Sequence, residues 1–298
     1  MDEIKSAVHH WWPRSVSKHW VGDDGYVGAV RANGYHFRTQ HGKLGGIKNA
    51  HTLKMAPEGQ TSPWDHSFEM KYDGADQSFP RIIEEIQNLV SIWMESNPPL
   101  TIFQEVQASN WLRLNLARSL VSICLRGPLN RFMALDLAMK LRGGRISPRE
   151  QNRIIGHNIQ HMLKDYVKYM SGRGKVGLLF SPEREFIFGD GFFHNLTTAG
   201  NINHSARMII PLTPRISVIY AMPHSWTPEP MFHACMITAD VTDQMNRTIE
   251  VYSKDELFYC NERPNPSKDF LLGKFQKYDW GRNPADHIIA KLPGIHEI

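Results

Sequence analysis

The residues best suited to chemistry lie far apart in the chain. His9 and His10 stand near the start, and Asp190 follows the apolar run Phe186-Ile187-Phe188 between two glycines. Histidine is the usual general base near neutral pH, and a carboxylate at the end of a strand suits metal binding or base catalysis. In an extended segment neighbouring side chains point to opposite faces, so the two histidines would not bind one metal ion together. The alternatives are structural: a packed aromatic segment for His9 and His10, and an ordinary turn for Asp190.

A second candidate site is a basic face on one helix. The helix expected over residues 147–170 carries cationic side chains and histidines at steps of three or four residues, with no acidic residue among them: Arg149, Arg153, His157, His161, Lys164 and Lys168. Residues 131–184 contain eleven Lys and Arg residues against four Asp and Glu residues. Such a face favours contact with the phosphates of nucleic acid or of another polyanion. A solvated helix surface is the alternative.

Other polar patterns are less specific. His157 and His161 resemble the histidine pair of a zinc protease, but Asn158 stands where the catalytic glutamate belongs. This excludes that activity and leaves a bare metal-binding pair as an alternative. The loop after Asp190 has polar residues in no known zinc spacing: His194, Asn195, Asn201, Asn203 and His204. The chain has no nucleophile elbow, no phosphate-binding loop with lysine and no dinucleotide-binding glycine pattern.

The composition is that of a folded globular protein. The chain has 298 residues, of which 41% are hydrophobic and 21% charged, and its net charge is +4. These values exclude wholesale disorder, collagen and coiled coil. No apolar run reaches the ~18–20 residues of a membrane-spanning helix, and the N-terminus lacks the pattern of a signal peptide. Three cysteines, odd in number and far apart, favour a reducing cytoplasm.

The first part of the chain is expected to place strands before helices. Turn signals flank strand-like sequence within residues 9–54, and residues 55–79 have the composition of a loop. A central block of helices follows over about 80–170, with Pro80 at the first helical position and a capping box at Ser147. Its helices are predicted over residues 80–96, 103–125, 129–142 and 147–170.

Strands are expected again over residues 175–222. The apolar segments 175–180 and 184–190 are separated by Ser181-Pro182-Glu183 and would form a hairpin. A helix from residue 238 to 252 and an irregular tail complete the chain. This order predicts one α+β domain over residues 1–298, in which the N- and C-terminal β segments pack together beside a central block of about four helices.

Several short motifs follow one another between residues 8 and 255. They are His9-His10-Trp11-Trp12-Pro13 before Asp24-Gly25, Arg126-Gly127-Pro128-Leu129-Asn130-Arg131, Gly189-Asp190-Gly191-Phe192, Pro211-Leu212-Thr213-Pro214, and Asn246 before Val251-Tyr252-Ser253. In this order they resemble a bacterial family known as domain-of-unknown-function family 4238. The family has serine, asparagine and proline where this chain has Gly189, Gly191 and Phe192. The resemblance implies the fold and adds Arg126, Arg131 and Asn246 as candidate site residues, and it implies no activity.

Together these observations predict a hydrolase that acts on a phosphate-bearing substrate, with nucleic acid as the expected class. Asp190 with His9 or His10 would form the catalytic or metal centre, and a divalent metal ion of unspecified identity is a candidate cofactor. The residues expected to bind phosphates are Arg126, Arg131, Arg149, Arg153, Lys164, Lys168 and Asn246. Two alternatives are a non-catalytic nucleic-acid-binding or regulatory protein and a protein–protein interaction module.

Overall fold

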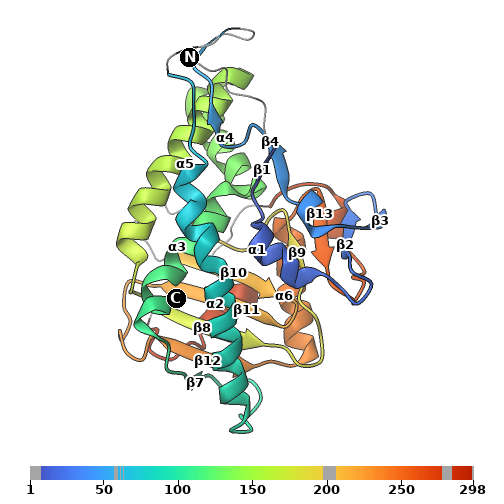
Figure 1. The fold of residues 1–298 in the computed structure, drawn as a ribbon, viewed down its shortest axis with the longest axis vertical. Coiled ribbons are helices and arrows are strands. Elements are labelled where there is room, and N and C mark those ends of the chain that lie inside the picture. Colours follow the sequence, from blue (N-terminus) through green and yellow to red (C-terminus); the bar gives the residue numbers. More distant parts are fainter. Residues whose placement is uncertain are drawn as a thin grey trace.

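The computed structural model describes residues 8–56, 60, 62, 64–196, 206–276 and 284–296. Its helices are α1 (Arg14–Ser17), α2 (Met70–Met94), α3 (Asn110–Arg126), α4 (Pro128–Arg142), α5 (Pro148–Met170), α6 (Ala239–Tyr252), α7 (Lys268–Leu271) and α8 (Pro284–Ile289). Its strands are β1 (Val8–His10), β2 (Val27–Arg31), β3 (His36–Thr39), β4 (Gly46–Lys48), β5 (Thr52–Leu53), β6 (His66–Ser67), β7 (Gln104–Glu105), β8 (Lys175–Phe180), β9 (Phe188–Gly189), β10 (Ala206–Thr213), β11 (Ile216–Met222), β12 (Phe232–Met236) and β13 (Glu256–Tyr259). The predicted α+β class is confirmed (Figure 1).

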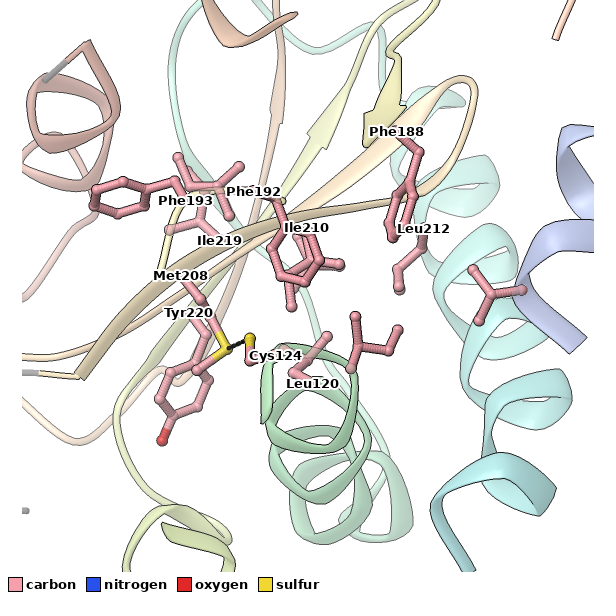
Figure 2. Packing of buried hydrophobic residues seen from close by; sticks show 14 of the residues in the cluster. Leu120, Cys124, Phe188, Phe192, Phe193, Met208, Ile210, Leu212, Ile219 and Tyr220 are labelled. Atoms are coloured by element: carbon pink, nitrogen blue, oxygen red, sulfur yellow. Dashed lines mark hydrogen bonds between the residues drawn. The ribbon is translucent and has the colours of Figure 1, made fainter. Parts of the chain in front are cut away.

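The larger sheet packs against the helical block. Its strand order is β10-β11-β8-β12-β7, with β8 antiparallel to β11 and parallel to β12. All residues of β10 and β11 are buried, which accounts for their mainly apolar sequences. Figure 2 shows Leu120 and Cys124 of α3 against Met208 of β10 and Tyr220 of β11, with the Cys124 and Met208 sulfur atoms 3.9 Å apart.

The smaller sheet joins the two ends of the chain. Its order is β3-β2-β13-β9, and β2 is antiparallel to β13 with Val30 opposite Leu257. Two or three short strands from one end could not bury a sheet face alone, so strands remote in sequence complete it. The N-terminal strands thus share one sheet with β9, which lies in the predicted segment 175–222. β13 lies in the tail that the sequence predicts to be irregular, so that prediction is wrong for residues 256–259.

The first long helix begins earlier than the sequence indicates. α2 begins at Met70, so residues 70–79 are helical and Pro80 lies inside the helix. Tyr72 and Phe79 are buried on its inner face, and this packing outweighs the weak helix propensity of the segment. Pro80 has no N–H to bond the carbonyl of Asp76, and the Ser15 hydroxyl donates to that carbonyl at 3.4 Å instead.

Local end signals of the other helices give the expected boundaries. The Ser147 hydroxyl accepts from the Glu150 N–H and the Glu150 carboxylate accepts from the Ser147 N–H, which is the predicted capping box. Gly143 ends α4 with a φ of 71°. α3 begins at Asn110, later than predicted, because the Ser109 side chain caps it by accepting from Leu112 at 3.1 Å.

The hairpin predicted over residues 175–190 is wrong. β8 pairs with β11 and β12, whereas β9 pairs with β13 in the other sheet. β8 is apolar on both faces and suits the centre of a sheet, so its neighbours come from elsewhere in the chain. The connecting segment crosses between the sheets, where Phe186 N–H donates to the Pro214 carbonyl at 2.7 Å.

Among the described residues, no helix is long and apolar enough to span a bilayer.

Candidate active site

The N-terminal aromatic segment positions the first two histidines. β1 pairs with β4, with His9 opposite Ile47. Trp12 follows and is fully buried, with its ring 4.6 Å from that of Phe188 and 4.7 Å from that of Phe258 between centroids. Phe188 belongs to β9 and Phe258 to β13. His9 and His10 are therefore anchored beside the smaller sheet.

Both ring nitrogens of each histidine have contacts within the protein. His9 Nδ1 accepts from the His51 backbone N–H at 3.3 Å, and His9 Nε2 lies 3.3 Å from a carboxylate oxygen of Glu69. Because an amide N–H can only donate, the proton of the neutral His9 ring is on Nε2. His10 Nδ1 lies 3.0 Å from the Leu44 carbonyl, and its Nε2 lies 3.2 Å from the Arg14 guanidinium. Neither ring keeps a nitrogen free for a substrate.

In His51 the backbone N–H and carbonyl form hydrogen bonds, whereas the ring nitrogens do not. Its carbonyl accepts from the Phe68 N–H at 2.8 Å and from the Ser67 hydroxyl at 3.3 Å. Its ring centroid lies 4.7 Å from that of Tyr72. His51 is 1% exposed, and neither ring nitrogen has a hydrogen-bond partner among the described residues. An unpaired buried polar group costs about 1–3 kcal/mol, so such a ring indicates a site that holds water or a ligand.

Arg126 brings a buried positive charge to the same place. The residue is 1% exposed, and its two terminal nitrogens donate to the two carboxylate oxygens of Asp76, one of them at 3.0 Å. The Arg126 Cζ atom lies 5.0 Å from the centre of the Tyr72 ring, a cation–π contact. Arg126 Nε and Tyr72 Oη have no hydrogen-bond partner among the described residues.

Arg131 completes the group from the next helix. α3 ends at Arg126 and α4 begins at Pro128, so the motif that contains both arginines spans a helix junction. An Arg131 nitrogen donates to the carbonyl of Ala50 at 3.1 Å, and Ala50 is the residue immediately before His51. We call His51, Tyr72, Arg126 and Arg131 the buried cluster. It brings the predicted residue His9 and the predicted pair Arg126 and Arg131 to one place.

The electrostatics of the buried cluster keep its imidazole uncharged. Burial, with the nearby charges of Arg126, His9 and Arg131, lowers the pKa of His51 to about 2. Burial also raises the pKa of Tyr72 and lowers that of Arg131. The side chains of Glu69 and Asp76 are 51% and 40% exposed, so the cluster lies one side chain below the surface. A neutral base and a neutral hydroxyl beside two guanidinium groups suit the binding of an anion.

Asp190 forms its hydrogen bonds elsewhere. Its two carboxylate oxygens accept from the backbone N–H groups of Lys254 and Asp255, at 2.8 and 2.9 Å, and so close the turn between α6 and β13. Burial raises the pKa of Asp190 to about 7 despite these two donors. A side chain at Gly191 would overlap the carbonyl of Tyr252, which explains the glycine beside it. The catalytic pair of Asp190 with His9 or His10 that the sequence predicts is therefore not formed.

We expect Asp190→Asn to lower the free energy of unfolding by about 1–3 kcal/mol. The amide has one acceptor oxygen, so one of the two backbone N–H groups loses its partner. The folded protein also holds the Asp190 proton up to about pH 7, whereas an ordinary aspartate loses it near 3.8. Wild-type stability therefore falls as pH rises between these two values, and this contribution is absent from the variant.

Urea denaturation at about pH 5 and about pH 8 measures the effect. The loss caused by Asp190→Asn should be larger at the lower pH. Asp243→Asn on α6 is the matched control, because its side chain is 48% exposed and its charge is not among those that shift the pKa of Asp190. A loss that grows with pH would contradict the assignment.

The basic face of α5 is present, and its first part holds the segment after His51. Arg149 and Arg153 both donate to the carbonyl of Met55, Arg153 at 2.7 Å. Asn152 donates to the Thr52 carbonyl at 2.9 Å. α5 thereby fixes β5 and the residues that follow it beside the buried cluster.

The second part of the basic face is open to solvent. His157, Lys164 and Lys168 are exposed. His161 Nδ1 lies 3.1 Å from Asp165, an acidic neighbour that the spacing of the cations did not reveal. The face is therefore less purely cationic than the sequence indicates.

The remaining candidates have structural contacts or fall outside the described residues. Asn246 donates to the Glu185 carbonyl at 2.9 Å and accepts from the Ile187 N–H at 3.0 Å, which ties α6 to the segment before β9. His194 is buried, and burial lowers its pKa to about 4. Asn201, Asn203 and His204 lie outside the described residues. In the part of the chain that the structure describes, no three His, Cys, Asp or Glu residues are grouped to hold a metal ion.

Three residues of the site escape prediction from the sequence: His51, Tyr72 and Asp76. Tyr72 and Asp76 are one helical turn apart, a spacing that places them on one helix face. That signal is hidden because residues 55–79 have the composition of a loop. His51 follows Asn49-Ala50 in no recognisable pattern, and His9, which its N–H contacts, is 42 residues away.

Comparison with protein-family models, with curated proteins and with solved structures finds no match for this chain. The resemblance to family 4238 therefore stays a prediction.

Proposed function

We propose that this protein is a hydrolase acting on a phosphate-bearing substrate, with the buried cluster as its active site. One observation carries the proposal. Four buried polar atoms without hydrogen-bond partners among the described residues belong to the cluster: His51 Nδ1, His51 Nε2, Tyr72 Oη and Arg126 Nε. The terminal nitrogens of Arg126 donate to Asp76, and one Arg131 nitrogen donates to the Ala50 carbonyl. The Arg126 Nε–H and the remaining N–H groups of Arg131 are the charged donors that suit the oxygens of a phosphate.

The chemistry follows from the charges. A bound phosphate offsets the charges of Arg126 and Arg131, which raises the pKa of His51 from its low value. The imidazole then accepts a proton from a water molecule as the water oxygen attacks phosphorus and the bond to the leaving oxygen breaks. The guanidinium groups and the Tyr72 hydroxyl donate to the phosphoryl oxygens, and the leaving oxygen takes a proton from solvent.

Nucleic acid is the substrate class we favour. α5 holds the segment that follows His51, and its exposed Lys164 and Lys168 lie further along the same helix. A strand lying along α5 would have its phosphates near cations over several nucleotides. A cytoplasmic location fits this role, since Cys124, Cys235 and Cys260 are free and buried.

The proposal predicts that His51→Gln lowers phosphodiester hydrolysis about 100-fold or more, since a general base contributes ~10²–10⁴-fold. Rates are measured with bis(p-nitrophenyl) phosphate and with a labelled single-stranded oligonucleotide. His224→Gln, at an exposed position between β11 and β12, is the matched control and should leave the rate unchanged. Arg131→Met should weaken binding of inorganic phosphate about 10-fold or more in calorimetry, because a charged hydrogen bond is worth about 1.5–3 kcal/mol.

The outcomes separate the alternatives. Phosphate binding that depends on Arg131, without hydrolysis of any substrate, would favour a non-catalytic binding protein. Neither binding nor hydrolysis would contradict the proposal and favour an interaction module. The double change Lys164→Gln and Lys168→Gln tests the substrate class: it should reduce the salt dependence of oligonucleotide binding by about two charges. No change would remove nucleic acid as the substrate.

A further inference from the structure

A cavity of about 240 Å³ lies between the larger sheet and helices α6 and α8, away from the buried cluster. Its walls are mainly apolar, formed by Phe103, Leu179, Ile237, Val241 and Ile288. A cavity of about 150 Å³ lined by such residues stays dry and holds a benzene molecule, so this one has room for about eight carbon atoms. The interior therefore favours a hydrocarbon group over water or a phosphate.

The rim of this cavity carries the positive charge of Lys291. Lys291 and His287 line it from one face, four residues apart, and both are exposed. No carboxylate is among the described residues that line the cavity. Thr101 and Gln244 add hydrogen-bonding side chains to the wall. An ammonium group at the mouth of an apolar cavity is a ready partner for a single negative charge.

Lys291 also acts on the interior of the cavity. Cys235 lies in the wall and is 2% exposed. Burial raises the pKa of the Cys235 thiol to about 11, and the charge of Lys291 opposes this rise. The Lys291 ammonium group is therefore close enough to Cys235 for its charge to act on the cavity wall.

We propose that this cavity binds a small apolar monocarboxylate, whose hydrocarbon part fills the interior and whose carboxylate pairs with Lys291 and His287. The hydrocarbon accounts for the apolar walls, and the single charge accounts for the cationic rim without an acidic residue. A phosphate-bearing ligand of the size of a nucleotide would place too much polar surface against apolar walls. The site is independent of the proposed hydrolase activity, because it shares no residue with the buried cluster.

Calorimetry with octanoate, octan-1-ol and acetate on the full chain tests the proposal. Octanoate should bind to one site, whereas octan-1-ol should bind more weakly because it lacks the charge, and acetate should not bind detectably because it lacks the chain. Lys291→Met should weaken octanoate binding about 10-fold and leave octan-1-ol binding unchanged, the size expected for one charged contact. Lys164→Met is the matched control at an exposed lysine on α5, and it should change neither.

A second measurement locates the ligand. Octanoate should shift the methyl NMR signals of Val241 and Ile288, which line the cavity, and leave those of Val30 and Leu257 in the smaller sheet unchanged. Val241→Trp should block octanoate binding by filling the cavity, and the methyl shifts in the wild type answer the question if that variant does not fold. Equal binding of octanoate and octan-1-ol, an unchanged affinity in Lys291→Met, or no shift of the Val241 and Ile288 signals would overturn the proposal.

Discussion

Replacing Trp12 with alanine is expected to lower the free energy of unfolding by about 3–5 kcal/mol, the usual cost of truncating a buried aromatic side chain. Trp12 is fully buried, stacks on Phe188 and Phe258, and meets the Trp20 ring edge-on at 6.0 Å. It connects the start of the chain to two strands from its second half. The space left by the indole would stay largely empty, because the surrounding rings belong to different elements and cannot all move inward.

Chemical denaturation followed by circular dichroism measures this loss. Trp12→Phe is the matched variant: it keeps an aromatic ring and removes the indole N–H, which has no hydrogen-bond partner among the described residues. It should therefore cost much less than the alanine change. His10→Ala, at a half-buried position, should also be milder. A loss below about 1 kcal/mol in Trp12→Ala would mean that the N-terminal segment is not part of the core.

Removing the negative charge of Asp76 is expected to destabilise the protein by about 3 kcal/mol. Arg126 is almost completely buried, and both of its terminal nitrogens donate to Asp76. Asp76→Asn leaves this guanidinium charge without compensation, which costs about 3–5 kcal/mol in buried pairs. The lower end applies because the Asp76 side chain is 40% exposed, so water can replace part of what is lost.

Two controls identify the cause of that loss. Asp243→Asn removes a carboxylate whose side chain is 48% exposed and which pairs with Arg184, and it should cost less than about 1 kcal/mol. Combining Asp76→Ala with Arg126→Met removes both charges and should be more stable than Asp76→Asn alone. If the double variant is the less stable one, the ion pair itself and not the unpaired charge supplies the stability.

Signals that act within one helical turn were predicted correctly. Ser147 and Glu150 cap α5, and Gly143 ends α4. These hydrogen bonds join residues no more than four apart, so the local sequence contains both partners. The same holds for the apolar spacing of the long helices.

Features that depend on distant partners were not predicted. α2 extends back to Met70 because Tyr72 and Phe79 pack against other elements and because Ser15 bonds the carbonyl that Pro80 cannot. The strands expected to form one hairpin are divided between two sheets, since β8 pairs with β11 and β12. Neither the Ser15 contact nor the strand pairing has a signature in the neighbouring residues.

By itself, the sequence determined the α+β class and the central block of helices. These follow from composition, periodicity and motif order, which are local or additive properties. Only the tertiary structure decided which side chains are free to act. It occupies both nitrogens of His9 and both oxygens of Asp190, and it buries the His51 ring near two arginines with no hydrogen-bond partner from the described part of the chain. Whether a polar group is free depends on what surrounds it in space, and its hydrogen-bond partners lie tens of residues away in the chain.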